Sequence, residues 1–289
     1  MKKSWLPVSA VVLGILWMLA GGAAFTIMGA LIKHLSQTLP ITVIVFFRML
    51  IGFALLLPWI LRERLTPVVT SQPGLHVVRS ITGFLSLMCL VYSLSRLDLT
   101  DAVAISFTTP LWMIIIAAVL LGEGSGPRRW LATVIGFGGV LVIVRPDMDP
   151  DPAMLAALAS ACLGSLSLAC VKKLSRFDSA LTITFYFALI GTLFSIVPAM
   201  FTWVWPTPFE YLLLVATGIT GVTGLMCSAR AYSLADATVI SPVDFTRLPF
   251  AAVIGYVIFG ETPDLWTLSG VVIIMASILY IGRRAKVRA

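Results

Sequence analysis

Long apolar stretches alternate with short polar segments along the whole chain. Ten apolar stretches of roughly 17–23 residues fill the 289 positions, and each is long enough to cross a hydrocarbon core about 30 Å thick as a helix. The connections between them are rich in proline, glycine and charge, as expected of loops. The pattern predicts an all-α polytopic membrane protein with ten transmembrane helices, near residues 8–32, 41–61, 74–94, 100–121, 128–145, 152–173, 180–203, 209–231, 238–259 and 265–282.

The second half of the chain repeats the first. The segment TGFLSLMC at 82–89 returns as TGVTGLMC at 220–227, and Pro110 and Gly122-Glu123 have counterparts 138–140 positions later. Five is an odd number of crossings, so a five-helix repeat enters the bilayer in the opposite orientation the second time. Inverted repeats are typical of transporters that work by alternating access. The predicted units are residues 1–147 and 148–289.

Composition and charge support a membrane location. Hydrophobic residues make up 59% of the chain and charged residues 11%, with a mean hydropathy of +1.03, which excludes an ordinary soluble domain. If the N-terminus is cytoplasmic, fifteen Lys and Arg residues fall on that side and only Lys33, Arg96 and Arg145 on the other. This asymmetry predicts that both termini are cytoplasmic. The basic residues form no single patch, so we expect lipid and a small molecule as partners, and no nucleic acid.

The sequence lacks the motifs expected for several kinds of chemistry. The four cysteines lie inside predicted helices without CxxC spacing, and only two histidines are present, so we expect no disulfide framework, metal site or cofactor. The glycine-rich segment 122–126 follows no strand and is not followed by Gly-Lys-Ser/Thr, which argues against nucleotide hydrolysis. An intramembrane enzyme would need partners for its one buried carboxylate, and none is evident. Glycine and serine pairs in the helices fit either internal packing or a homodimer, so the oligomeric state stays open.

Among the charged residues of the predicted helices, three stand out as kept inside the membrane, where each costs at least about 2.5–3.5 kcal/mol. Asp244 and Arg247 are three residues apart and share a helix face, so they can pair. The pair either fixes helix packing or opens to bind a zwitterion, with an ammonium near Asp244 and a carboxylate near Arg247. Arg48 has no acidic neighbour on its own helix. It must bond backbone carbonyls, reach another helix or face a water-filled cavity.

Prolines interrupt the fourth and ninth predicted helices at matching places. Pro110 corresponds to Pro249, and Pro242 adds a second break close to Asp244. Each proline removes a backbone donor and leaves carbonyls free. Matching interruptions indicate a central binding site, although a packing kink without a ligand would look the same. We treat the three prolines as hinge or gating candidates.

Aromatic and basic residues supply the other cavity candidates. Trp17, Tyr92 and Trp112 are predicted within helices, where they form either a cavity wall or ordinary lipid-facing and core packing. His76 and Arg79 open the third helix. They serve either as anchors at the headgroup level or as the lining of an inner gate.

Four short motifs carry a resemblance to a known family. Phe46-Phe47-Arg48, Arg79, Pro110 followed by Leu120-Leu121-Gly122-Glu123, and Phe259-Gly260-Glu261 resemble the EamA family of the drug/metabolite transporter superfamily. The resemblance covers essentially the whole chain as two EamA units, near 13–145 and 152–283. It implies a ten-helix bundle with a central cavity between its halves. Members of the family move small metabolites across the inner membrane, so the resemblance implies a bacterial inner-membrane location. The aromatic amino-acid exporters of the family are similar in length and layout, and we expect this chain to lie nearest to them.

The sequence therefore predicts an exporter or facilitator of amino acids and similar small metabolites. The two halves would rock around a midplane cavity, driven by the substrate gradient rather than by protons. The alternative is an exchanger of another metabolite, such as a nucleotide derivative or a sugar phosphate. That alternative calls for several converging cavity arginines or lysines.

Overall fold

The computed structural model describes residues 8–62, 69–120, 127–144, 151–234, 243–262 and 264–285. All regular secondary structure in these ranges is helical. Seven helices in them are long and apolar enough to span a membrane, and three shorter apolar helices lie at 130–143, 247–259 and 265–277. The all-α membrane prediction is confirmed. The count of ten crossings stays a prediction, because it depends on the three shorter helices.

The helices follow the predicted segments closely. The fourth segment is divided into α4 and α5, and the ninth is broken at Phe245-Thr246 ahead of α11, which continues into η3, a π-helix. Two helices of the second half begin at caps, since Asp151 accepts from the amide of Ala153 at 2.7 Å and Ser179 from that of Thr182 at 3.1 Å, which satisfies amides that have no partner inside the helix. The helices are α1 Val8–Leu35, α2 Ile41–Arg62, α3 Pro73–Leu94, α4 Leu99–Ser106, α5 Thr109–Leu120, α6 Pro127–Val144, α7 Pro152–Leu174, α8 Ala180–Phe201, α9 Pro208–Leu234, α11 Arg247–Ile254, η3 Gly255–Phe259 and α12 Leu265–Ala285.

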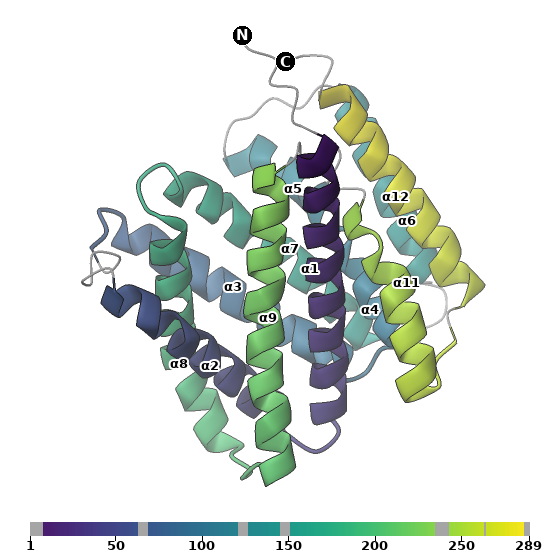
Figure 1. Cartoon of the computed structure of the whole chain (residues 1–289). Coiled ribbons are helices and arrows are strands. Elements are labelled where there is room, and N and C mark those ends of the chain that lie inside the picture. The colour runs from purple at the N-terminus through teal and green to yellow at the C-terminus, as the bar shows by residue number, and fades with distance from the viewer. Residues whose placement is uncertain are drawn as a thin grey trace.

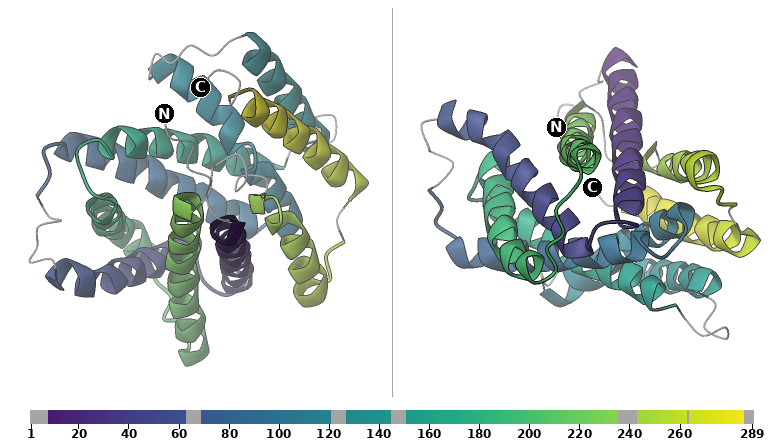
Figure 2. Two further views of the ribbon diagram at one scale, coloured as in Figure 1. Left: turned by 45° about the horizontal axis from the view of Figure 1, so that its top comes forward. Right: turned by 90° about the horizontal axis from the view of Figure 1, so that it is seen from below.

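The two halves interlock rather than standing apart. Helix α1 packs against α9, and α3 packs against α7, so the first helix of each half contacts the third helix of the other half. Helices α2 and α8, α4 and α11, and α6 and α12 pair with their own counterparts. Figures 1 and 2 show α1 beside α9 and α6 beside α12. This exchange is what an approximate two-fold relationship between the repeats produces.

The interruptions of the two divided segments meet each other. A turn at Phe107-Thr108 separates α4 from α5, and a turn at Phe245-Thr246 precedes α11. The rings of Phe107 and Phe245 lie 4.9 Å apart, and their positions differ by the repeat offset of 138. The two breaks therefore touch through equivalent residues near the centre of the fold.

The prolines lie just after these breaks. Pro110 is in the first turn of α5 and Pro249 in the first turn of α11, where a helix tolerates proline because those amides have no partner within the helix. Pro242 lies outside the described residues. Helix division therefore occurs at the Phe-Thr turns, and the prolines follow it.

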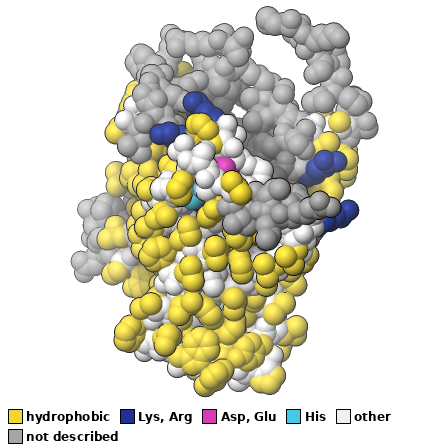
Figure 3. Space-filling view, turned by 90° about the vertical axis from the view of Figure 1, so that its left-hand side faces the viewer, with side chains coloured by type: hydrophobic (Ala, Val, Ile, Leu, Met, Phe, Trp, Pro, Cys, Tyr) yellow, Lys and Arg dark blue, Asp and Glu magenta, His cyan; other side chains and the backbone are white. Residues whose placement is uncertain are grey.

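The surface has the character of a membrane protein. On the face in Figure 3, hydrophobic side chains cover the lower part almost without charge, while Lys and Arg side chains gather toward the upper part. The start of α1 and the end of α12 lie at the same end of the molecule (Figure 1). This arrangement agrees with an even number of crossings.

Candidate functional site

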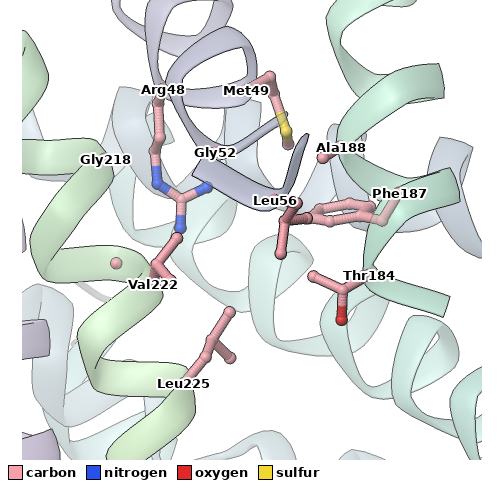
Figure 4. Close-up of a pocket in the computed structure, with 11 residues that line it drawn as sticks. Arg48, Met49, Gly52, Leu56, Thr184, Phe187, Ala188, Gly218, Val222 and Leu225 are labelled. Carbon is pink, nitrogen blue, oxygen red and sulfur yellow. The ribbon is translucent and has the colours of Figure 1, made fainter. Parts of the chain in front are cut away.

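A pocket opens between α2, α8 and α9, with Arg48 on one of its walls (Figure 4). The pocket is open to its surroundings, and its empty volume counted together with that open space is about 430 Å³. Arg48 and Thr184 are polar in a lining that is otherwise apolar or glycine. The lining residues are Arg48, Met49, Gly52 and Leu56 from α2, Thr184, Phe187 and Ala188 from α8, and Gly218, Gly221, Val222 and Leu225 from α9.

Arg48 has little to satisfy its charge. One terminal nitrogen lies 3.6 Å from the sulfur of Met28, a weak acceptor, and Nε is buried without a hydrogen-bond partner. Among the described residues, no carboxylate forms an ion pair with Arg48. Gly221 lies beside both groups, since a Cβ there would lie 3.2 Å from the sulfur of Met28 and 3.7 Å from a nitrogen of Arg48. A buried guanidinium without an anion is costly, so this arrangement indicates a ligand group that accepts hydrogen bonds.

Phe187 forms another wall of the pocket and is backed by a second arginine. The guanidinium carbon of Arg79 in α3 lies 3.8 Å from the centre of the Phe187 ring, a close cation–π contact. Nε and one terminal nitrogen of Arg79 are buried without partners. Ser167 donates to the carbonyl of Arg79 at 3.0 Å, and Gly83 packs directly against the ring. Arg48 therefore lines the pocket directly, whereas Arg79 contacts Phe187, a residue of the pocket wall, from behind.

Aromatic side chains close the other end of the three pocket helices. Phe47 at the start of α2 contacts Trp203, which follows α8, with ring centres 5.8 Å apart, and Tyr211 at the start of α9 at 5.5 Å. Phe46 and Trp205 extend the same cluster. The cluster therefore joins α2, the segment after α8 and the start of α9 beside Phe47, the residue next to Arg48.

An ion pair joins the two halves at the end of α1. Lys33 pairs with Glu261, which follows η3, and donates to the carbonyl of Leu97 at 2.6 Å. The second oxygen of Glu261 accepts from the amide of Leu99 at 2.8 Å, at the start of α4. These four residues, the Lys33–Glu261 cluster, tie α1 and α4 of one half to the ninth segment of the other.

A second polar cluster lies at the opposite end of α3. Nε2 of His76 is 2.9 Å from Oδ2 of Asp178, and Thr70 donates to the same oxygen at 2.8 Å. The ring of Tyr186 lies 4.4 Å from that of His76, and the side chain of His76 is fully buried. We call these four residues the His76–Asp178 cluster. At about 1.5 Å per residue, the length of α3 separates it from Leu97 and the Lys33–Glu261 cluster.

Asp244 and Arg247 form the expected pair at 3.7 Å. The guanidinium carbon of Arg247 lies 5.2 Å from the Phe25 ring centre and 5.8 Å from that of Phe107, and its Nε is buried without a partner. The pair thus lies at the central Phe-Thr break. It does not line the Arg48 pocket.

The aromatic candidates are dispersed. Trp17 is 37% exposed on α1, Trp112 packs against Phe137 at 4.8 Å, and Tyr92 lies near Arg96 at the end of α3. None of the three lines the Arg48 pocket. Sequence reasoning missed Phe187, although it lies 139 positions after Arg48 and so occupies the equivalent place in the second repeat.

Two interlocked helical repeats, with a pocket between them that Arg48 lines, are the features of a multi-pass membrane transporter. The chain belongs to the EamA-like transporter family, which it matches over residues 12–145 and 151–283. The family resemblance of the short motifs is therefore confirmed. The expectation that the protein is not an enzyme agrees with this family.

Three curated relatives are similar over nearly their whole length. The S-adenosylmethionine uptake transporter of Rickettsia prowazekii is 33% identical over 93% of this chain and 92% of its own. The riboflavin transporter of Vibrio cholerae is 30% identical over 93% and 92%, and the pseudopaline exporter of Pseudomonas aeruginosa is 32% identical over 94% and 97%. A solved crystal structure with 18% identity has the same fold, with a TM-score of 0.61 over 96% of this chain and 98% of the other. None of these names supports placing the chain among aromatic amino-acid exporters.

Proposed function

We propose that the protein transports a small metabolite that presents an anionic or oxygen-rich group to Arg48. The observation that carries this proposal is the guanidinium on the pocket wall, whose Nε is buried without a partner and which has a thioether as its described hydrogen-bond acceptor. Charge-assisted hydrogen bonds to carboxylate or phosphate are the strong interactions of arginine. A ligand with such a group would satisfy Arg48 where the protein does not.

The substrate proposed is larger than a simple amino acid. The three relatives are named for S-adenosylmethionine, riboflavin and pseudopaline, each of which is larger than a simple amino acid. Arg79 behind Phe187 adds a second positive charge beside the pocket. This set of groups favours a metabolite other than an amino acid, the alternative raised by the sequence.

The proposed mechanism is alternating access around the Arg48 pocket. Thr184 lies four residues after the start of α8, so the pocket occupies the half of the fold nearest the His76–Asp178 cluster. The Phe47 aromatics and the Lys33–Glu261 cluster close the other half. Moving the substrate across requires this closed end to open and the pocket end to close.

The membrane arrangement proposed is ten crossings in two inverted units, residues 1–147 and 148–289, with both termini cytoplasmic in an inner membrane. In that orientation the pocket opens to the cytoplasm. The turns at Phe107-Thr108 and Phe245-Thr246, together with Pro110, Pro249 and Pro242, would be the places that bend. The relatives include both an uptake transporter and an exporter, so the mechanism is written without a net direction.

Counterflow in proteoliposomes tests the proposal. The purified protein is reconstituted without an ion gradient and given labelled S-adenosylmethionine, riboflavin, pseudopaline and amino acids one by one. We expect accumulation of at least one of the larger metabolites, lost in Arg48→Gln and kept in Arg62→Gln, a change at the exposed end of α2. Accumulation that is equal in wild type and Arg48→Gln would contradict the proposal, as would the absence of counterflow for every compound.

A further inference from the structure

We infer that Phe187 is a specificity-determining residue, which selects substrates that join a planar aromatic ring to an anionic group. The inference rests on the proposed function, because it assigns the anionic group to Arg48. It adds a second contact, stacking of the substrate ring on Phe187. The two contacts together define a substrate class that neither defines alone.

The repeat makes this arrangement informative. Arg48 and Phe187 are 139 positions apart, the offset of the two halves, and both line one pocket. Their surroundings are equivalent as well, since Gly221 lies beside Arg48 and Gly83 beside Phe187, with the glycines 138 positions apart. A two-fold fold would by default present two like walls. Here one wall is a cation and the other a ring, which suits a ligand with two unlike ends.

Arg79 packs against the ring of Phe187 and holds it in position for stacking. Its guanidinium lies 3.8 Å from the ring centre and so covers one face. Figure 4 shows the side chain of Phe187 pointing into the pocket toward Leu56. A cation on one face draws electron density from the ring, so the remaining surface favours an electron-rich heterocycle over a second cation. A ring already held in place also reduces the ordering cost of binding.

Gly52 leaves space on the α2 wall of the pocket. A Cβ added there would meet no atom within 4 Å, whereas a Cβ at Gly218 would clash with Ile51 and one at Gly221 would press on Met28. The space beside Gly52 is therefore open. A larger residue at position 52 would occupy the pocket directly, one helical turn from Arg48.

Binding of three related probes to the purified full-length protein tests the inference. S-adenosylhomocysteine carries both a ring and a carboxylate, methionine carries the carboxylate without the ring, and adenosine carries the ring without the carboxylate. We expect wild-type protein to bind S-adenosylhomocysteine roughly tenfold tighter than either part, because a stacked ring and a charge-assisted contact each contribute a factor of that order.

Two variants separate the contacts. Phe187→Leu should reduce the preference for S-adenosylhomocysteine over methionine to roughly twofold, the expected loss of an aromatic contact, and leave methionine binding unchanged. Gly52→Leu should exclude the ring-bearing probes and spare methionine. Phe201→Leu, at an exposed position of α8, the helix that carries Phe187, serves as the matched control and should behave as wild type.

The outcomes distinguish failure of this inference from failure of the proposed function. An unchanged ring preference in Phe187→Leu, or equal binding of methionine and S-adenosylhomocysteine by wild type, would overturn the inference. Binding that is lost in Arg48→Gln, measured beside these variants, would still support the proposed function. Absence of binding by all three probes would also overturn the inference, whereas counterflow of another anionic metabolite would leave the proposed function standing.

Discussion

Lys33 in the first repeat forms an ion pair with Glu261 in the second, 228 positions later. Their side chains are only 13% and 9% exposed. The same pair reaches the backbone of Leu97 and Leu99, at the connection between α3 and α4. One carboxylate therefore holds together three segments at the closed end of the molecule, and alternating access requires this contact to break.

Replacing Glu261 should loosen that end. Glu261→Gln keeps the size of the side chain and removes the charge, which leaves Lys33 partly buried without an anion. The probe is Leu97→Cys, at a buried position, in a background where the four native cysteines are replaced by alanine. We expect Glu261→Gln to make this probe react roughly tenfold faster with a maleimide, which corresponds to opening that is easier by about 1.4 kcal/mol. Asp98→Asn, an exposed neighbour, is the control. Equal labelling rates at position 97 with and without Glu261→Gln would show that the ion pair does not hold the end closed.

The His76–Asp178 cluster should contribute to stability. Asp178→Asn weakens the hydrogen bond of the only partner described for the buried side chain of His76, and such a loss typically costs about 1–3 kcal/mol. Thr70→Val removes one hydrogen bond to the same oxygen and should cost less, about 0.5–1.5 kcal/mol. Thermal unfolding in detergent measures both free energies. A midpoint for Asp178→Asn no lower than that of Asp98→Asn would contradict this role.

Adjacent glycines of α6 provide a packing test. A Cβ at Gly139 would lie 2.8 Å from the carbonyl of Gly270 in α12, whereas a Cβ at Gly138 would meet nothing within 4 Å. Gly139→Ala should therefore lower the free energy of unfolding by about 1–3 kcal/mol, as overpacking does, and Gly138→Ala should leave it nearly unchanged. Equal midpoints for the two variants would mean that α6 and α12 do not pack this closely.

The Asp244–Arg247 pair should affect turnover more than binding. It lies at the Phe107–Phe245 break and outside the Arg48 pocket. Arg247→Gln leaves Asp244 as an unpaired carboxylate, and we expect the counterflow rate to fall roughly tenfold, equivalent to about 1.4 kcal/mol, with substrate affinity little changed. A loss of affinity as large as that of Arg48→Gln would instead place the pair in the substrate site, as the zwitterion hypothesis holds.

Much of the fold could be predicted because it depends on local patterns. Apolar length located the helices, and the match of Pro110 with Pro249 located the two interruptions to within a few residues. The turns themselves fall at Phe107-Thr108 and Phe245-Thr246, before the prolines, because a proline is readily accommodated in the first turn of the helix that follows.

The site was harder to predict because its contacts join distant parts of the chain. Arg48 and Arg79 were candidates on charge alone, but Phe187 is an ordinary aromatic residue in an apolar helix until the fold places it beside Arg79. Lys33 and Glu261, or His76 and Asp178, carry no local sign that they pair. Trp17 was a cavity candidate from its depth in the helix. The structure places it on the exposed side of α1, a direction that sequence position does not determine when a helix is apolar all round.

The most direct test of the account is counterflow by Arg48 variants with the substrate that wild-type protein accumulates. We expect Arg48→Gln to lose substrate affinity by roughly tenfold or more and Arg48→Lys to retain part of it, because lysine keeps the charge without the two-pronged geometry. Arg62→Gln on the same helix should transport as wild type does. Wild-type affinity in Arg48→Gln, with the protein folded and reconstituted equally, would contradict the claim that this arginine binds the substrate.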